Sequence, residues 1–248
     1  MKVIFHNDFH QVYTSDPASA EGRIEAIIKV IEKKVEFVTA LPASREDIAL
    51  VHSPDHINSI KNGGLYEIAA LAAGGAIQAA EIGLSEPAFA VIRPPGHHAS
   101  GDSCWGFCFF NNMAIAMRTL LQRGRIQTGY VLDIDMHFGD GTMNTIGHYP
   151  CFTVFNPVSH YREAYMDEVK REMDSCRADI IGISAGFDNH EADWGGVLKT
   201  EDYREIGKLV REAARRNKAG YFAILEGGYN HTVLGYNALA LIEGMEGD

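Results

Sequence analysis

The chain has 248 residues, of which 46% are hydrophobic and 22% charged, with 25 Gly and 8 Pro. These proportions exclude a disordered chain, a collagen-like repeat and a coiled coil. The formal net charge of −11 at pH 7 disfavours nucleic acid and anionic membranes as partners, and weakly favours a cationic small molecule or a basic peptide.

Short apolar runs recur along the chain, and each is followed by a turn-rich loop and then by a helical pattern. The predicted strands are residues 3–5, 35–38, 88–92, 130–134, 152–155, 180–184 and 221–225. Between them, isoleucines at helical spacing predict a helix over 24–31, and a second helix over 112–122 begins at Asn111 and stops at Gly124. The Ala-rich segment 65–82 predicts a buried helix in which Gly74 and Gly75 permit close packing.

This alternation predicts an α/β fold, a three-layer α/β/α arrangement around a mostly parallel central sheet. No linker and no internal repeat is visible, so we expect one domain over residues 1–248. The four cysteines form no CxxC pair, and the longest apolar stretches are far too short to cross a membrane. We therefore expect a cytoplasmic protein without disulfides, signal peptide or membrane span.

In an open parallel sheet, ligand sites form beyond the carboxyl ends of the strands, so chemistry is expected in the loops that leave them. Four of these loops are rich in histidine, aspartate or glycine. They read RPPGHH at 93–98, DIDMHFGDG at 133–141, AGFD at 185–188 and EGGYN at 226–230. The sequence thus predicts one polar site at the carboxyl edge of the sheet.

The second of these loops has the spacing of a metal site. Side chains alternate along an extended segment, so Asp133, Asp135 and His137 project to one side. Asp135 and His137 can reach a common cation, and Asp188, which follows another strand, is the natural third ligand. These donors suit Zn²⁺ but would also accept Fe(II), Co(II) or Mn(II). In isolation, the two aspartates would equally suit helix caps.

The adjacent histidines of the first loop favour catalysis. His97 and His98 follow a rigid Pro-Gly turn, and Asp133 and Asp140 are available to orient them. A carboxylate fixes the tautomer of a histidine and raises its pKa, which prepares a general base and acid for hydrolysis. At the same rim, Tyr229 can donate a hydrogen bond to a developing oxyanion, although a tyrosine in a glycine loop is often simple packing.

Five motifs together resemble those of the zinc-dependent histone deacetylase and acetylpolyamine amidohydrolase superfamily, in the same order along the chain. They are RPPGHHA at 93–99, GFCFFNN at 106–112, DIDMHFGDGT at 133–142, SAGFD at 184–188 and LEGGYN at 225–230. The resemblance implies an arginase-like fold and a metal-dependent amidohydrolase. It also implies one Zn²⁺ per chain, replaceable by Fe²⁺ or Co²⁺, on Asp135, His137 and Asp188.

The resemblance also implies the catalytic roles. His97 would pair with Asp133 and His98 with Asp140, with His98 as the general base and acid and His97 as an electrostatic partner. Tyr229 would bind the amide oxygen while a zinc-bound water, deprotonated toward His98, attacks the carbon. Acetate and a free amine result.

For the substrate, the resemblance implies that the Gly106 carbonyl accepts the amide N–H and that Phe107 forms one wall of an acyl tunnel. The segment 156–165 is short where relatives carry the opposite wall, so His160 or Tyr161 is expected there. A more open site is predicted. The substrate is an acetylpolyamine, an acetyllysine or another N-acetylated amine, and a homo-oligomer is compatible with the sequence.

At two further places, Phe138 and the Phe155-Asn156 pair, the sequence differs from the motifs of this superfamily. Phe138 stands where many of them have a second histidine. Phe155 and Asn156 stand where the histone deacetylase branch binds a structural K⁺, which leaves a K⁺ near Asp133 an open question.

Two other functions share parts of this pattern. A ureohydrolase of the arginase or agmatinase type would hold two manganese ions, but its GGDH and DxDxxDP motifs do not occur here. A non-catalytic module would bind an acyl ligand in the same pocket without turnover. The complete set of metal ligands, histidines and tyrosine favours the deacetylase.

Overall fold

The computed structural model describes residues 1–247, whose strands form one seven-stranded sheet. The strands are β1 (Lys2–Phe5), β2 (Glu36–Thr39), β3 (Ala88–Ala90), β4 (Gly129–Asp133), β5 (Phe152–Phe155), β6 (Ile180–Ala185) and β7 (Gly220–Leu225). Their order is β2-β1-β3-β7-β6-β4-β5, and every neighbouring pair is parallel. All seven predicted strands are present, with ends that differ by one or two residues.

Helices connect the strands. The α-helices are α1 (Arg23–Ile31), α2 (Arg45–Ile48), α3 (Pro54–Asn62), α4 (Tyr66–Gly83), α5 (Asn112–Gln122), α6 (Asp140–Ile146), α7 (Arg162–Ser175), α8 (Thr200–Asn217) and α9 (His231–Glu246), and two 3₁₀ turns, η1 (Asn7–His10) and η2 (Pro17–Ser19), follow β1. The prediction for α5 is confirmed: the Asn111 side chain caps it by accepting the Ala114 N–H, and Gly124 follows with a φ of 64°.

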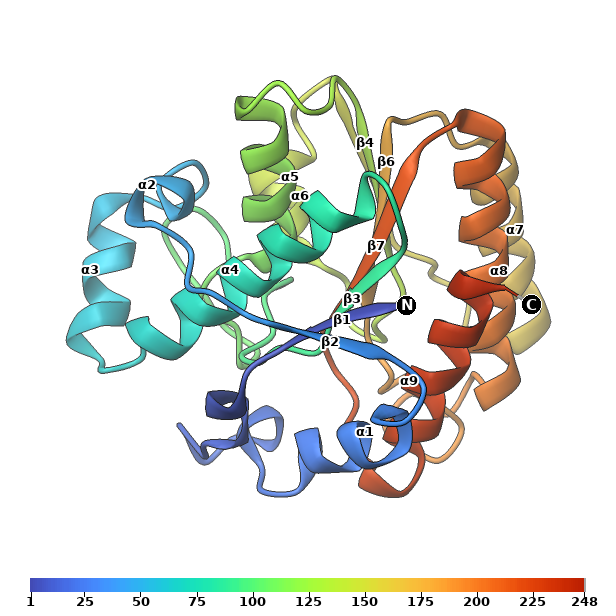
Figure 1. Ribbon diagram of the computed structural model, residues 1–248, viewed down its shortest axis with the longest axis horizontal. Helices are drawn as coiled ribbons and strands as arrows, with labels where there is room; N and C mark the ends of the chain where they lie inside the picture. Colours follow the sequence, from blue (N-terminus) through green and yellow to red (C-terminus); the bar gives the residue numbers. More distant parts are fainter. Residues whose placement is uncertain (248) are drawn as a thin grey trace.

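The helices cover both faces of the sheet, which confirms the three-layer α/β/α prediction. In Figure 1, α4 and α5 lie on one side of the twisted sheet, and α1, α7, α8 and α9 lie on the other. Helix α4 packs on α5, whereas α9 packs on both α1 and α8. Strands β3, β4 and β6 are therefore buried along their whole length, as expected for a parallel sheet between two helical layers.

The small residues of α4 allow close contact with a neighbouring segment. A Cβ atom at Gly74 would lie only 1.9 Å from the carbonyl oxygen of Leu41. In the same contact, the Ala43 N–H donates to the Ala70 carbonyl at 2.8 Å. The Gly74-Gly75 pair therefore serves packing, which confirms the sequence interpretation.

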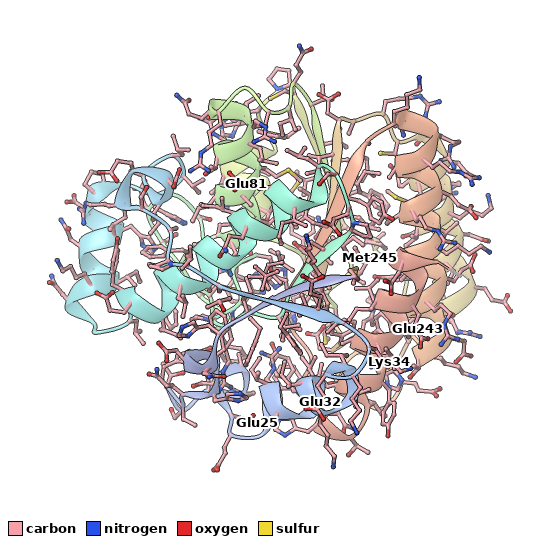
Figure 2. All side chains as sticks on the ribbon, in the orientation of Figure 1. Glu25, Glu32, Lys34, Glu81, Glu243 and Met245 are labelled. Carbon is pink, nitrogen blue, oxygen red and sulfur yellow. The ribbon has the colours of Figure 1, made fainter. Side chains whose placement is uncertain are left out.

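Charged side chains lie mainly on the outer surface (Figure 2). One pair, Lys34 and Glu243, joins the segment before β2 to α9 at 3.2 Å. Such an exposed pair contributes only about 0 to 1 kcal/mol. All four cysteines are free thiols, and none of the helices within residues 1–247 combines the length and hydropathy needed to span a bilayer.

The parallel topology positions the site. Because every strand points the same way, the loops after β3, β4, β6 and β7 leave the sheet at one edge. The register is level there: Asp133 of β4 pairs with Ser184 of β6, which pairs with Ile224 of β7. The four loops singled out in the sequence therefore meet.

Candidate active site and metal centre

Three donor side chains converge beyond the ends of β4 and β6. The Nδ1 atom of His137 lies 3.0 Å from Asp135 Oδ1 and 3.1 Å from Asp188 Oδ2. One donor atom of each residue lies within 4.8 Å of the other two. Backbone N–H groups hold the second oxygens, because Gly227 donates to Asp135 Oδ2 and Met136 donates to Asp188 Oδ1. Each carboxylate is thus fixed with one oxygen facing the imidazole.

The electrostatics of this cluster favour a cation. Burial, with the neighbouring Asp135 carboxylate, raises the pKa of Asp188 to about 7. Its Oδ2 atom is buried and lies 3.1 Å from the Nδ1 atom of the His137 imidazole. Hydrogen bonds to both carboxylates raise the pKa of His137 to about 10, so positive charge is stabilised between them. Two carboxylate oxygens and one imidazole nitrogen that face one another in this way fit a divalent metal ion.

The first histidine–aspartate pair lies in the interior. His97 Nδ1 contacts Asp133 Oδ2 at 3.1 Å, and both residues are buried. Burial opposes a charge on His97, but the carboxylates of Asp135, Asp133 and Glu226 outweigh it and raise its pKa well above the usual value. This pair is therefore a buried ion pair next to the candidate metal ligands.

The second pair lies at the rim. His98 Nδ1 contacts Asp140 Oδ1 at 2.7 Å. The indole of Trp105 stacks on the His98 ring, with centroids 3.8 Å apart, and donates from Nε1 to Asp140 Oδ2 at 2.9 Å. Burial and the positive charge of His97 lower the pKa of His98 to about 4. His98 is therefore neutral near pH 7, and its Nε2 atom is free to take a proton.

Tyr229 is held by aromatic contacts on both sides. Trp194 stacks on its ring at 4.0 Å, and Phe107 meets it edge-on at 6.0 Å. Burial raises its pKa above the usual range, and the Asp135 and Asp188 carboxylates add to this effect, so the phenol stays a hydrogen-bond donor.

Buried hydrogen bonds hold the loop that carries Tyr229. The guanidinium of Arg23, fully buried, donates to the carbonyl oxygens of Glu226 and Gly228. A Cβ atom at Gly227 would lie 2.5 Å from Asp135 Oδ2, so a glycine is needed where this backbone approaches the metal ligand. The Glu226 carboxylate in turn accepts the N–H groups of Gly96 and His97. One buried network thus joins the Tyr229 loop to the histidine loop.

These groups surround a chamber of about 270 Å³. It is lined by Pro95, His97, His98, Trp105, Gly106, Phe107, His137, Trp194, Gly227 and Tyr229. Both predicted substrate residues, Gly106 and Phe107, therefore border the space in front of the histidines. The chain has only two tryptophans, and both border it too.

The prediction that His160 or Tyr161 forms the chamber wall opposite Phe107 was wrong. Trp194, from the loop after β6, lines the chamber, whereas His160 lines a neighbouring cavity and Tyr161 lines neither. The short loop after β5 contributes no residue to the chamber, and the Trp194 indole from the loop after β6 lines it instead. The sequence signals for the missed residues were weak: Trp105 directly precedes the GFCFFNN motif, and Trp194 follows Asp188 by six positions.

A second group of donor side chains lies beside the chamber. His97, Cys108 and Glu226 place one donor atom each within 4.8 Å of the others. Burial raises the pKa of the Cys108 thiol well above its usual value, and burial raises that of Glu226 to about 7. A thiolate ligand must lose its proton, whereas the buried Cys108 thiol keeps its proton and directs it toward the Gly106 carbonyl. This group is therefore a poor metal site.

A sequence profile described as "Histone deacetylase domain" matches residues 60–157 and 156–245. The chain belongs to the histone deacetylase family. It is 28% identical to the histone deacetylase-like amidohydrolase of Pseudomonas aeruginosa, over 94% of this chain and 77% of the relative. It is 30% identical to acetylpolyamine amidohydrolase 1 of the same organism, over 64% of this chain and 56% of the relative.

A solved structure, the crystal structure of the HDA15 HD domain, has the same fold. It superposes with a TM-score of 0.83 at 19% identity, over 98% of this chain and 88% of that one. The family assignment makes the chain a hydrolase that acts on amides, with the deacetylase activity and metal dependence general to this family. It also decides against the ureohydrolase alternative.

Proposed function

We propose that the chain is a zinc-dependent deacetylase that hydrolyses the amide of an N-acetylated amine, of the acetylpolyamine or acetyllysine type, to acetate and the free amine. The observation that carries this proposal is the convergence of three metal-ligand candidates, two histidine–aspartate pairs and one tyrosine around one chamber. A module that only bound an acyl ligand would have no need for a neutral, oriented histidine beside the metal centre.

In this proposal, Asp135, His137 and Asp188 hold the zinc ion. When bound, the ion supplies a Lewis acid that polarises the amide carbonyl and makes water more acidic. The choice of zinc rests on the donor set, which Fe²⁺ and Co²⁺ would also fit. Phe155 offers no hydroxyl, and the Asn156 side-chain oxygen accepts the Gly139 N–H at 2.9 Å, so nothing further supports a potassium ion.

Tyr229 and His98 would carry the chemistry on the protein side. The Tyr229 hydroxyl donates a hydrogen bond to the amide oxygen, which gains negative charge as water attacks the carbon. His98 Nε2 accepts the proton of the attacking water, because Nδ1 faces Asp140 and the ring is neutral. It then donates that proton to the amine nitrogen as the C–N bond breaks.

The remaining residues would position these groups. His97, paired with Asp133, would keep a positive charge beside the Asp135 carboxylate. The Gly106 carbonyl accepts the substrate N–H, and Phe107 with Trp194 encloses the alkyl chain. Because strands from residue 2 to residue 225 share one sheet, we also infer that residues 1–248 act as one catalytic domain.

The test is acetate release by zinc-loaded protein from matched acetylpolyamines and acetyllysine peptides, with metal analysis of the same samples. We expect about one zinc ion per chain and release that falls about 10²- to 10³-fold in Tyr229→Phe, because the oxyanion donor is lost. Release from neither panel, or unchanged release by Tyr229→Phe, would contradict the proposal. In the first case the acyl-binding module becomes the better description.

A further inference from the structure

A second cavity adjoins the metal centre and has no part in the chemistry described above. Its volume is about 280 Å³, close to that of the catalytic chamber. His137 forms a wall of both, and Asp135 lines the second as well. Trp194 borders the chamber while the next residue, Gly195, borders the second cavity. The second cavity, called the side pocket below, therefore lies directly against the chamber, with the His137 ring between them.

The side pocket exists because the loop between β5 and α7 is short. Residues 156–160 line the pocket, and α7 begins only two residues later, at Arg162. This backbone is held in place, because the Glu168 carboxylate accepts the Val158 N–H at 2.8 Å. The Asn156 side chain accepts the Gly139 N–H from the opposite wall. The pocket is therefore built by specific contacts.

Apart from the candidate metal ligands and His160, the side chains of its wall are hydrocarbon or neutral polar groups. Met136, Phe138, Pro157 and Val158 supply hydrocarbon, whereas Asn156, Ser159 and Asn189 supply neutral hydrogen-bonding groups. Asp135, already committed to the metal centre, is the single carboxylate in this wall, and no lysine or arginine lines it. The ammonium groups of a polyamine would have no free carboxylate to pair with in this pocket. An aromatic ring could instead pack on the hydrocarbon side chains while an adjacent amide hydrogen-bonds to the neutral polar groups.

The exposed hydrophobic side chains of the protein also gather here. Trp105, Met136, Phe138, Val158, Tyr161 and Trp194 lie on the loops around the two cavities, and they are six of the ten large hydrophobics with high exposure in residues 1–247. Such a concentration marks a surface that a ligand covers.

We propose that this side pocket binds the part of the substrate beyond the scissile amide, and that this part is an uncharged aromatic or apolar group attached through an amide. This inference rests on the proposed function and narrows it to substrates of the capped acetyllysine kind. It excludes a free linear acetylpolyamine as the preferred substrate.

A matched substrate pair tests the inference. The first compound is N-acetyl-1,5-diaminopentane, and the second is the same molecule with its far amino group capped by benzoyl. Acetate release by the zinc-loaded protein is measured for both. We expect kcat/KM to be about tenfold higher for the capped compound, because its ring buries apolar surface in the side pocket. Equal values, or a preference for the free amine, would overturn the inference.

A variant that fills the side pocket tests whether the benzoyl group binds there. Val158→Trp places an indole at the mouth of the side pocket, so the ratio of the two kcat/KM values should fall toward one. Val12→Trp is the matched control, since Val12 is similarly exposed but lies on the loop between η1 and η2. It should leave the ratio unchanged. A ratio that stays high in Val158→Trp would show that the benzoyl group binds elsewhere.

Binding without turnover separates the two proposals. Trp105 and Trp194, the only tryptophans, report the site by intrinsic fluorescence in metal-free protein. We expect the product N-benzoyl-1,5-diaminopentane to change this fluorescence at about tenfold lower concentration than 1,5-diaminopentane does. If neither acetylated compound releases acetate, the proposed function fails. If both do and the two amines bind equally, the side-pocket inference alone fails.

Discussion

The two histidine–aspartate pairs are neighbours in sequence and in space, yet their surroundings give them opposite properties. The rings of His97 and His98 lie 4.0 Å apart. His97 faces a fully buried aspartate and keeps a raised pKa, whereas His98 faces the partly exposed Asp140 under an indole and has a lowered pKa. The positive charge of the first histidine is itself one reason for the neutrality of the second.

This difference suggests a division of labour. In the proposed mechanism, the interior pair holds a buried charge and would contribute mainly to the stability and electrostatics of the candidate metal centre. The rim pair would contribute the group that moves a proton. Substitutions of the two histidines should therefore affect different quantities.

The largest effect is expected for His98→Ala. The variant lacks the proposed general base, so kcat should fall about 10²- to 10⁴-fold. Its free energy of unfolding should fall by less than about 2 kcal/mol, because Asp140 stays partly exposed to water. Steady-state kinetics and urea unfolding measure the two quantities. A variant that retains wild-type kcat would remove the proton-transfer role from the rim pair.

His97→Ala should instead act chiefly on stability. It leaves the Asp133 carboxylate buried without its partner, which costs about 3 to 5 kcal/mol of unfolding free energy. The measurement is the urea midpoint of His97→Ala beside that of His98→Ala. If the two variants lose the same stability, the comparison between an interior and a rim pair is wrong.

Trp105 should act through Asp140, as a positioning residue. Trp105→Phe keeps a ring over His98 but removes the indole N–H that binds Asp140. We expect kcat to fall about ten- to twentyfold with little change in KM, the lower end of the effect of one lost hydrogen bond to a charged group. The same change in an Asp140→Asn background should cost almost nothing further. Equal losses in both backgrounds would mean that Trp105 acts on the substrate instead.

The smallest effect is a shift in pH dependence. His98 serves as a base only when neutral, so kcat/KM falls as the pH drops through its pKa. Because burial and the charge of His97 lower that pKa to about 4, the acidic limb should lie well below the usual imidazole value of about 6.5. Trp105→Ala admits water to the ring and should move the limb toward neutral pH. Metal content measured at each pH separates this shift from loss of the ion, and a limb that stays in place would show that the indole does not control the burial of His98.

Much of the fold was predictable because its signals are local. Apolar runs of strand length and isoleucines at helical spacing depend only on nearby residues, and they placed all seven strands and helices such as α1 and α5. The errors at the ends, as in β3, which stops at Ala90 and not at residue 92, arise because strand ends depend on pairing with neighbours.

The candidate site was predictable where one loop carries several of its residues, as with Asp133, Asp135, His137 and Asp140. It was missed where a single residue arrives from a distant loop. Trp194 lines the chamber from the loop after β6, and Arg23, at the start of α1, reaches the carbonyl oxygens of a loop more than 200 residues away. A lone tryptophan or arginine has no local pattern that reveals such a contact.

The sequence by itself therefore determined which residue types are available for the chemistry and that parallel strands bring their loops to one edge. Only the tertiary structure decided which histidine is charged and which is neutral, and what shape the substrate finds beside them. The physical reason is that a pKa and a cavity both depend on water access and on charges from segments remote in the chain. Glu226 and the two tryptophans make those contributions here.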